Sequence, residues 1–194
     1  EVLNNEDLSK YETIVIDTGG KCLDKMDELI IANNPKMGKG NGTLTLQGYG
    51  ERKRMFNALC KQIATKNKHV IFVAHRQSVK DGDDIRYIPL FGGSSYDSLV
   101  TELDLVGYME ANGRKRTITF DPTSRSDGKN TCYMPSVVEI PTIIDEAGNV
   151  IGNNDFIEKR IIASYIDSIK HRIEEGKKYN NAVEEIKQQI LKIT

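Results

Sequence analysis

The first clear pattern along the chain is a short apolar run at residues 13–16, which ends at the acidic residue Asp17. Threonine, isoleucine and valine in a continuous run, with no polar residue larger than threonine, are typical of a strand that is buried on both faces. A second run of this kind covers residues 69–74 and ends at His75. The pattern therefore predicts two buried strands, each followed by a polar side chain.

Between these two runs, apolar residues recur three and four positions apart. This spacing predicts one helix at about residues 21–33 and another after Gly48-Tyr49-Gly50. The glycine-rich stretch at residues 36–48 is interpreted as a mobile surface loop. A strand, two helices and a second strand in this order indicate an α/β fold with a mostly parallel sheet and crossover helices.

The middle of the chain alternates between turn signals and short extended segments. Residues 81–84 form an acidic turn, residues 85–90 a short extended piece, and Ser94 or Ser95 begins a helix that runs to about Glu102. Strands at residues 103–110 and 116–120 flank Asn112-Gly113, a strong hairpin signal. Further on, residues 121–130 are interpreted as a loop and residues 137–140 as extended.

The pattern changes again from about residue 154. Apolar residues three or four positions apart predict two charged amphipathic helices, separated at Glu175-Gly176. We therefore expect an α/β core at residues 1–152 and a helical extension at residues 153–194, which is an appendage or a surface for a partner.

Composition adds limits to this picture. The 194 residues carry a formal net charge of −1, so a strongly basic nucleic-acid surface is not expected over the whole protein. No stretch approaches the twenty apolar residues of a membrane span, and the start lacks a signal-peptide pattern. Three widely spaced cysteines do not suggest a disulfide framework or a zinc knuckle. We expect a cytoplasmic protein without a membrane partner.

The start of the chain is unusual because it opens on Glu1 and soon reaches an apolar strand. We expect that this sequence is a piece of a longer protein, although N-terminal processing would leave a similar start.

Asp17 is the first candidate for a functional residue. An apolar strand that ends in Asp has the form of a Walker B segment, whose carboxylate helps to hold the magnesium of a bound nucleotide. An Asp in this place also occurs simply as a cap of the following helix. Neither glycine cluster, at residues 19–21 or 37–42, has the GxxxxGK[ST] spacing of a phosphate-binding loop.

Four segments taken in order resemble a RecA-like P-loop ATPase, and in particular the phage-encoded AAA-type ATP-binding proteins linked to single-strand annealing and recombination. The resemblance covers roughly residues 10–130. The four segments are Thr13-Ile-Val-Ile-Asp17-Thr18, Gly48-Tyr-Gly50 before a helix with Phe56, His69-Val-Ile-Phe-Val-Ala-His75, and Leu103-Asp104-Leu-Val-Gly107-Tyr-Met with Arg116-Thr-Ile-Thr-Phe120.

The resemblance implies roles for particular residues. Asp17 would be the Walker B ligand of Mg²⁺, with Thr18 beside the bound ATP, and His75 would be a sensor of the γ-phosphate. Arg114 and Arg116 would act as fingers on the nucleotide of a neighbouring subunit in a homo-oligomer. Capping, or protection of an exposed hairpin, is the alternative for these polar residues. The glutamate that activates water in this class is not assigned.

The resemblance also implies a phosphate-binding loop upstream of Asp17, and the sequence contains none. We therefore expect a truncated RecA-like core that does not hydrolyse ATP by itself, from a parent ATPase of DNA recombination or replication. Single-stranded DNA is an implied partner, with Arg114–Arg116 and the loop of Arg125 and Lys129 as its candidate contacts. The alternative is a non-catalytic α/β interaction or scaffold domain. A nuclease or phosphotransfer site would need more converging carboxylates than Asp17.

Overall fold

The computed structural model describes residues 3, 6–92 and 94–192, except for the side chains of residues 81 and 94. The chain forms two compact units, which are described separately. Unit 1 contains Glu1–Leu103 and Ser124–Ser126, and unit 2 contains Asp104–Thr123 and Asp127–Thr194. The predicted division after residue 152 stays a prediction.

Unit 1 contains the two expected strands, β1 (Thr13–Asp17) and β2 (His69–Val73), which pair in parallel. Ile14 and Ile16 lie on the same face as Phe72, which packs into the core of the unit. The side chain of Val15 points to the other face and is 56% exposed. The prediction that this strand is buried on both faces is therefore wrong for the described chain, because helices pack against one face only.

The two predicted helices are α2 (Gly19–Asn33) and α3 (Leu46–Ala64). Thr18 caps α2 and Thr45 caps α3, each through its side-chain oxygen. The helix α2 ends before a short 3₁₀ turn, η1 (Pro35–Met37), because Pro35 disfavours helical backbone in the residue before it. The core of unit 1 is built from apolar side chains of these helices and of later segments: Leu23, Phe56, Phe91 and Leu99.

The glycine-rich stretch at residues 36–48 is held in place by side-chain packing and backbone hydrogen bonds. Leu44 is fully buried, and Gly38 and Leu44 form an isolated antiparallel bridge. The Thr45 N–H also donates to the Met37 carbonyl at 2.8 Å. The interpretation as a purely surface loop is therefore wrong, because one apolar side chain holds it against the helices.

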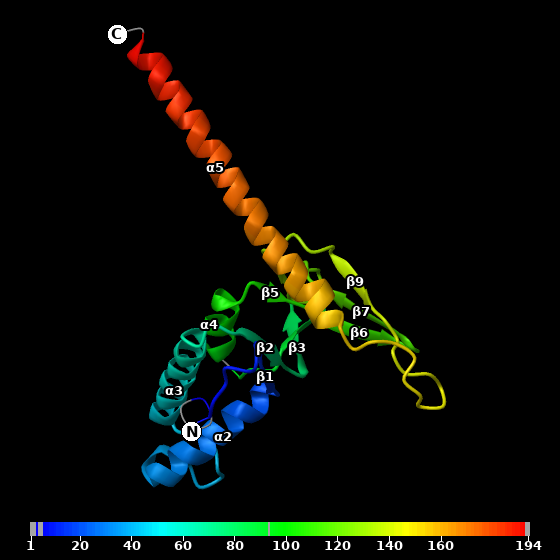
Figure 1. The fold of residues 1–194 in the computed structure, drawn as a ribbon. Coiled ribbons are helices and arrows are strands. Elements are labelled where there is room, and N and C mark those ends of the chain that lie inside the picture. The colour runs from blue at the N-terminus through cyan, green and yellow to red at the C-terminus, as the bar shows by residue number, and fades with distance from the viewer. Residues whose placement is uncertain (1–2, 4–5, 93, 193–194) are drawn as a thin grey trace. The chain divides into compact units, whose positions relative to one another are not determined.

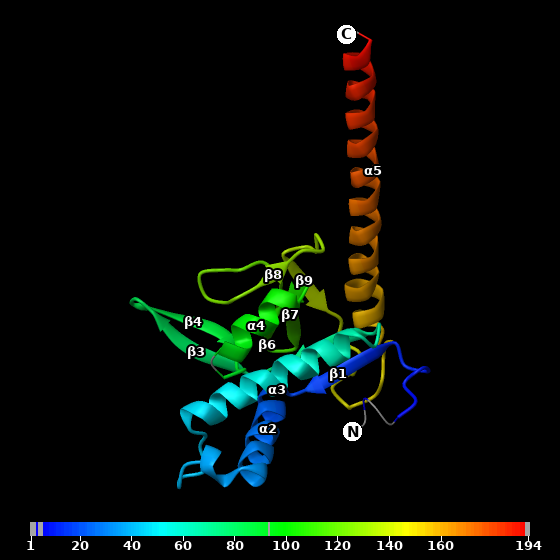
Figure 2. The ribbon, with the colours of Figure 1, turned by 90° about the vertical axis from the view of Figure 1, so that its left-hand side faces the viewer.

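After β2 the chain forms a β-hairpin of β3 (Arg76–Asp81) and β4 (Asp84–Pro89), which can be followed in Figure 2. The acidic turn and the extended piece at residues 85–90 were predicted, but β3 was not. Helix α4 (Ser94–Glu102) agrees with the predicted range, and Ser95 at its start is buried. The proposed capping side chain of Ser94 lies outside the described residues.

Unit 2 contains a three-stranded antiparallel sheet with the order β6 (Tyr108–Asn112), β7 (Lys115–Thr119) and β9 (Val137–Ile140). The turn between β6 and β7 confirms the Asn112-Gly113 hairpin, and Gly113 has φ +58. The predicted strand at residues 103–110 is broken at Gly107 into β5 (Leu105–Val106) and β6. A Cβ on Gly107 would lie 2.5 Å from Ile118, so only glycine fits at this break.

The segment at residues 121–130 was expected to be a loop. It contains β8 (Lys129–Asn130), which pairs with β5. The Asn130 side chain donates to Asp121 and to the Met134 carbonyl, and its oxygen accepts from the Met134 N–H. This network gives the segment an ordered path, so the loop interpretation is wrong for Lys129, whose side chain is half-buried in a strand.

The C-terminal part of unit 2 begins with a π-helical turn, η2 (Ile157–Ile162), and continues as α5 (Ala163–Leu191). Phe156, Ile161 and Tyr165 pack onto the core around Phe120. Figure 1 shows α5 as one helix that continues far beyond β6, β7 and β9. The prediction of two helices separated at Gly176 is wrong. A single glycine costs about 1 kcal/mol in a helix, which the flanking turns can offset.

Within the described residues the sheets are small, and only β1 and β2 are parallel. The α/β class is confirmed. The expectation of a mostly parallel sheet is wrong for the described residues, because the other pairs of named strands are antiparallel. None of the described helices has the length and apolar character required to cross a bilayer.

Candidate functional site

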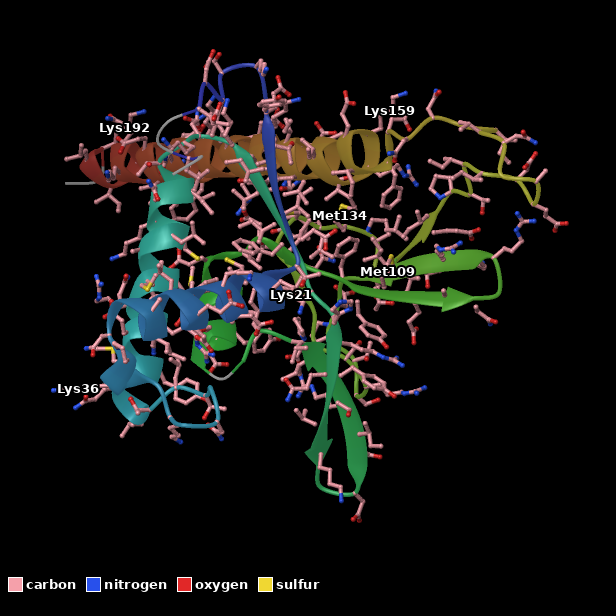
Figure 3. All side chains as sticks on the ribbon, turned by 90° about the horizontal axis from the view of Figure 1, so that it is seen from below. Lys21, Lys36, Met109, Met134, Lys159 and Lys192 are labelled. Atoms are coloured by element: carbon pink, nitrogen blue, oxygen red, sulfur yellow. The ribbon has the colours of Figure 1, made fainter. Side chains whose placement is uncertain are left out.

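Asp17 lies at the carboxyl end of β1, opposite Val73 at the end of β2. Its side chain is exposed. The next residue, Thr18, turns the chain into α2, where its Oγ1 accepts from the Lys21 N–H at 3.4 Å. Figure 3 labels Lys21 near the start of α2. The sequence thus places one carboxylate and one helix N-terminus at the carboxyl edge of a parallel strand pair, which is where open α/β sheets place ligands.

His75 follows β2 by two residues and therefore lies at the same edge of unit 1. Its side chain is exposed, and its carbonyl accepts from the Leu90 N–H at 2.7 Å. This bond ties the segment after the β3–β4 hairpin to the end of β2. The structure thus brings Asp17, Thr18 and His75 to one edge.

The segment Leu90–Phe91 also covers the first turn of α2. A Cβ on Gly19 would lie 2.1 Å from two atoms of the Phe91 ring, and one on Gly20 would lie 3.3 Å from the Leu90 carbonyl oxygen. The two glycines therefore allow close packing of this segment against the helix. They do not form an open phosphate cradle, because Phe91 occupies the space above Gly19.

An ion pair that the sequence reasoning missed lies between α2 and α3. Arg52 Nη1 is 3.2 Å from Asp27 Oδ2, and the side chains are 14% and 25% exposed. Arg52 Nη2 donates to the Gly92 carbonyl at 3.4 Å, and the guanidinium lies 4.8 Å from the centre of the Tyr49 ring. Arg52 therefore connects the two helices to the loop that follows Phe91.

Burial raises the pKa of the Asp27 carboxyl, and the positive charge of Arg52 opposes this shift. Asp27 Oδ1 and Arg52 Nε are buried and have no hydrogen-bond partner. The Asp27 carboxyl is therefore not a fully solvated surface group. Its position four residues after Leu23 and three before Ile30 places it on the buried stripe of α2, and this was the available signal.

The basic hairpin residues lie in unit 2. Arg114 pairs with Glu146 at 2.5 Å, Lys115 with Glu139 at 2.9 Å, and Arg116 donates to the Arg114 carbonyl at 3.3 Å. The carboxylate partners are 86% and 61% exposed. Such surface pairs contribute little to stability and are exchanged easily.

Magnesium in nucleotide sites is often held by one or two carboxylates, several waters and the substrate phosphates. Asp17 fits this description, because its carboxylate is exposed beside the hydroxyl of Thr18. Among the described residues, no three His, Cys, Asp or Glu side chains gather as a metal-binding group. The described residues at this edge therefore fit a magnesium ion that arrives with a nucleotide.

An α/β unit with polar side chains at the carboxyl edge of its parallel strands belongs to the class that binds ligands at this edge. A family model described as an AAA domain matches residues 2–132, about two-thirds of the chain. The chain belongs to this family of ATPase-type P-loop domains, which generally bind ATP with Mg²⁺. No curated protein and no solved structure matches it significantly.

Proposed function

We propose that the carboxyl edge of β1 and β2 is the magnesium side of an ATP site, with Asp17 as the Walker B carboxylate. The position of Asp17 carries the proposal: it ends an apolar strand in parallel register and is followed at once by a capped helix. His75, at the end of the neighbouring strand, is the proposed sensor, because a polar group there can reach the γ-phosphate region.

The phosphate-binding loop must come from a segment other than the 194 residues, since neither glycine cluster has the required spacing. The open face of the strand pair supports this proposal. Val15 is 56% and Val73 39% exposed, whereas parallel strands are normally covered on both faces. A further strand and helix carrying the loop would cover these side chains.

In this proposal the parent protein is a RecA-like ATPase of the phage type that acts on DNA during recombination or replication. Arg114 and Arg116 then act as fingers on the nucleotide of a second copy. The exposed ion pair between Arg114 and Glu146 does not prevent this, because a bound phosphate can replace the carboxylate. The resemblance of the ordered segments supports the DNA role.

The test compares two variants of the parent chain, whose substitutions lie at opposite ends of β1. Asp17→Asn removes the proposed ligand, and Glu12→Gln removes an exposed carboxylate before the amino end of β1. Asp17→Asn should abolish magnesium-dependent ATP turnover and weaken the binding of a fluorescent ATP analogue only when Mg²⁺ is present. Wild-type turnover in Asp17→Asn would refute the assignment.

The 194-residue chain provides a second test. It should show no magnesium-dependent ATP hydrolysis. Clear turnover would contradict the proposal that the phosphate-binding loop comes from another segment. A reading frame that encodes no GxxxxGK[ST] before Glu1 would instead favour the scaffold function, in which this edge binds no nucleotide. The exposed apolar stripe of α5 is the observation that favours such a role, since Ile173 and Ile186 are 53% and 56% exposed.

A further inference from the structure

The β3–β4 hairpin presents one face on which the two strands carry different kinds of side chain. In an antiparallel pair, residues directly opposite each other lie on the same face, and residues alternate between faces. Arg76 is opposite Pro89, Ser78 opposite Tyr87, and Lys80 opposite Ile85. We call this set of six residues the hairpin face.

The β3 side of the hairpin face is a row of hydrogen-bond donors. Arg76, Ser78 and Lys80 are exposed. Successive members are about 6.8 Å apart along the strand, which is twice the rise of an antiparallel strand. Guanidinium, hydroxyl and ammonium groups all donate to phosphate oxygens.

The β4 side of the same face is a row of apolar and aromatic residues. Ile85 is 55% exposed, and Tyr87 and Pro89 are half-buried. The hairpin face includes no acidic residue. Asp84 falls on the opposite face by alternation, and Asp83 lies in the turn. The opposite face carries Arg86 together with Asp84, so the hairpin as a whole is close to neutral, whereas the hairpin face itself is basic.

Tyr87 is held from both sides. Ser78 faces it on β3, and Ser126 pairs with it in parallel on the outer edge of β4. Its N–H donates to the Arg125 carbonyl at 2.7 Å, and the Arg76 guanidinium lies 4.5 Å from the centre of its ring. The backbone of Tyr87 is therefore held in place on both sides, and its ring makes a cation–π contact with the guanidinium of Arg76.

We propose that the hairpin face binds single-stranded nucleic acid, with the phosphates along Arg76, Ser78 and Lys80 and the bases over Tyr87 and Ile85. Single-strand binders combine a cationic track for the backbone with aromatic rings on which bases stack, and this face has one row of each kind. The row length limits the contact to roughly three nucleotides, at one nucleotide for each donor. The proposal deepens the proposed action on DNA and does not depend on the ATP site.

The test measures binding of a fluorescein-labelled thymidine 15-mer to the full 194-residue chain by anisotropy, without nucleotide, over a series of salt concentrations. The double variant Arg76→Gln/Lys80→Gln should weaken binding at least tenfold, and the slope of log K against log salt should fall by about 1.4, since each phosphate contact on a single strand contributes about 0.7. The matched control is Lys53→Gln/Arg54→Gln, which removes the same charges from exposed positions of α3 in the same unit.

A second measurement reports on stacking directly. The chain contains no tryptophan, so Tyr87→Trp introduces a single reporter. The oligonucleotide should quench its fluorescence, whereas Tyr179→Trp, on α5 at a position that is 71% exposed, should not respond. Circular dichroism checks that both variants are folded.

Three results would overturn the proposal. The first is equal loss of affinity in the α3 control, which would indicate general attraction of a polyanion. The second is equal affinity for duplex DNA of the same length, which would leave the apolar row without a role. The third is an absence of measurable binding at low salt. None of these results would affect the ATP proposal, because no nucleotide is present in the assay.

Discussion

Gly19 is the position at which one added methyl group tests the packing beside the candidate site. In Gly19→Ala the new Cβ would lie 2.1 Å from two atoms of the Phe91 ring, whereas carbon atoms normally approach to about 3.5–4.0 Å. Phe91 is only 3% exposed, so its ring cannot move into solvent without leaving the core. Overpacking of this kind costs about 1–3 kcal/mol.

A gain in helix propensity acts in the opposite direction, since alanine is favoured over glycine within a helix by up to about 1 kcal/mol. Gly19 is the first residue of α2, where this gain is smaller. We therefore expect Gly19→Ala to lower the free energy of unfolding by about 1–2 kcal/mol. Urea denaturation followed by circular dichroism at 222 nm measures this loss.

Gly50→Ala is the matched control, because Gly50 also lies in a helix and a Cβ there would meet no atom within 4 Å. This variant should be more stable than the wild type by about 0.5–1 kcal/mol. Phe91→Leu should relieve part of the Gly19→Ala loss, with a coupling of about 1 kcal/mol in a double-mutant cycle. A Gly19→Ala protein as stable as the wild type would refute the close approach of Phe91 to α2.

Three further predictions follow from single features of the structure. Burial raises the pKa of Asp27, so the folded state holds its proton more tightly than the unfolded state, and stability falls as the pH rises from about 4. Asp27→Asn should therefore gain stability relative to the wild type between pH 4 and pH 7, and urea melts over this range measure the difference. Gly176→Ala should raise the helix signal and slow amide exchange in α5, because the helix is continuous and a Cβ there meets nothing within 4 Å; lower helicity would indicate a break. Burial raises the pKa of the Cys22 and Cys60 thiols, so iodoacetamide at pH 8 should modify them slowly in the folded protein and rapidly in urea, as mass spectrometry of the peptides would show.

The elements that the sequence predicted well carry local signals. Apolar runs mark β1 and β2, apolar residues three and four positions apart mark α2 and α3, and Asn112-Gly113 marks the hairpin in unit 2. The same local order placed Asp17 and His75 after parallel strands and therefore at one edge. Their proposed chemical roles stay predictions.

The β3 strand shows why other elements could not be predicted. Its sequence, Arg-Gln-Ser-Val-Lys-Asp, contains one apolar residue and no alternation, so no periodic signal marks it. It becomes a strand because it pairs with β4, whose outer edge is held in turn by Ser126, nearly forty residues further along the chain. The β3 strand is therefore stabilised by pairing with other segments and not by the strand propensity of its own residues.

The sequence by itself determined the α/β class of unit 1, its main helices, and the polar residues that end its parallel strands, because each depends on neighbouring residues in the chain. The tertiary structure alone decided the pairing of Arg52 with Asp27, the two rows of the hairpin face and the continuity of α5 through Gly176. These features depend on which segments meet in space. Packing there outweighs the preferences of single residues, which amount to only about 1 kcal/mol at each position.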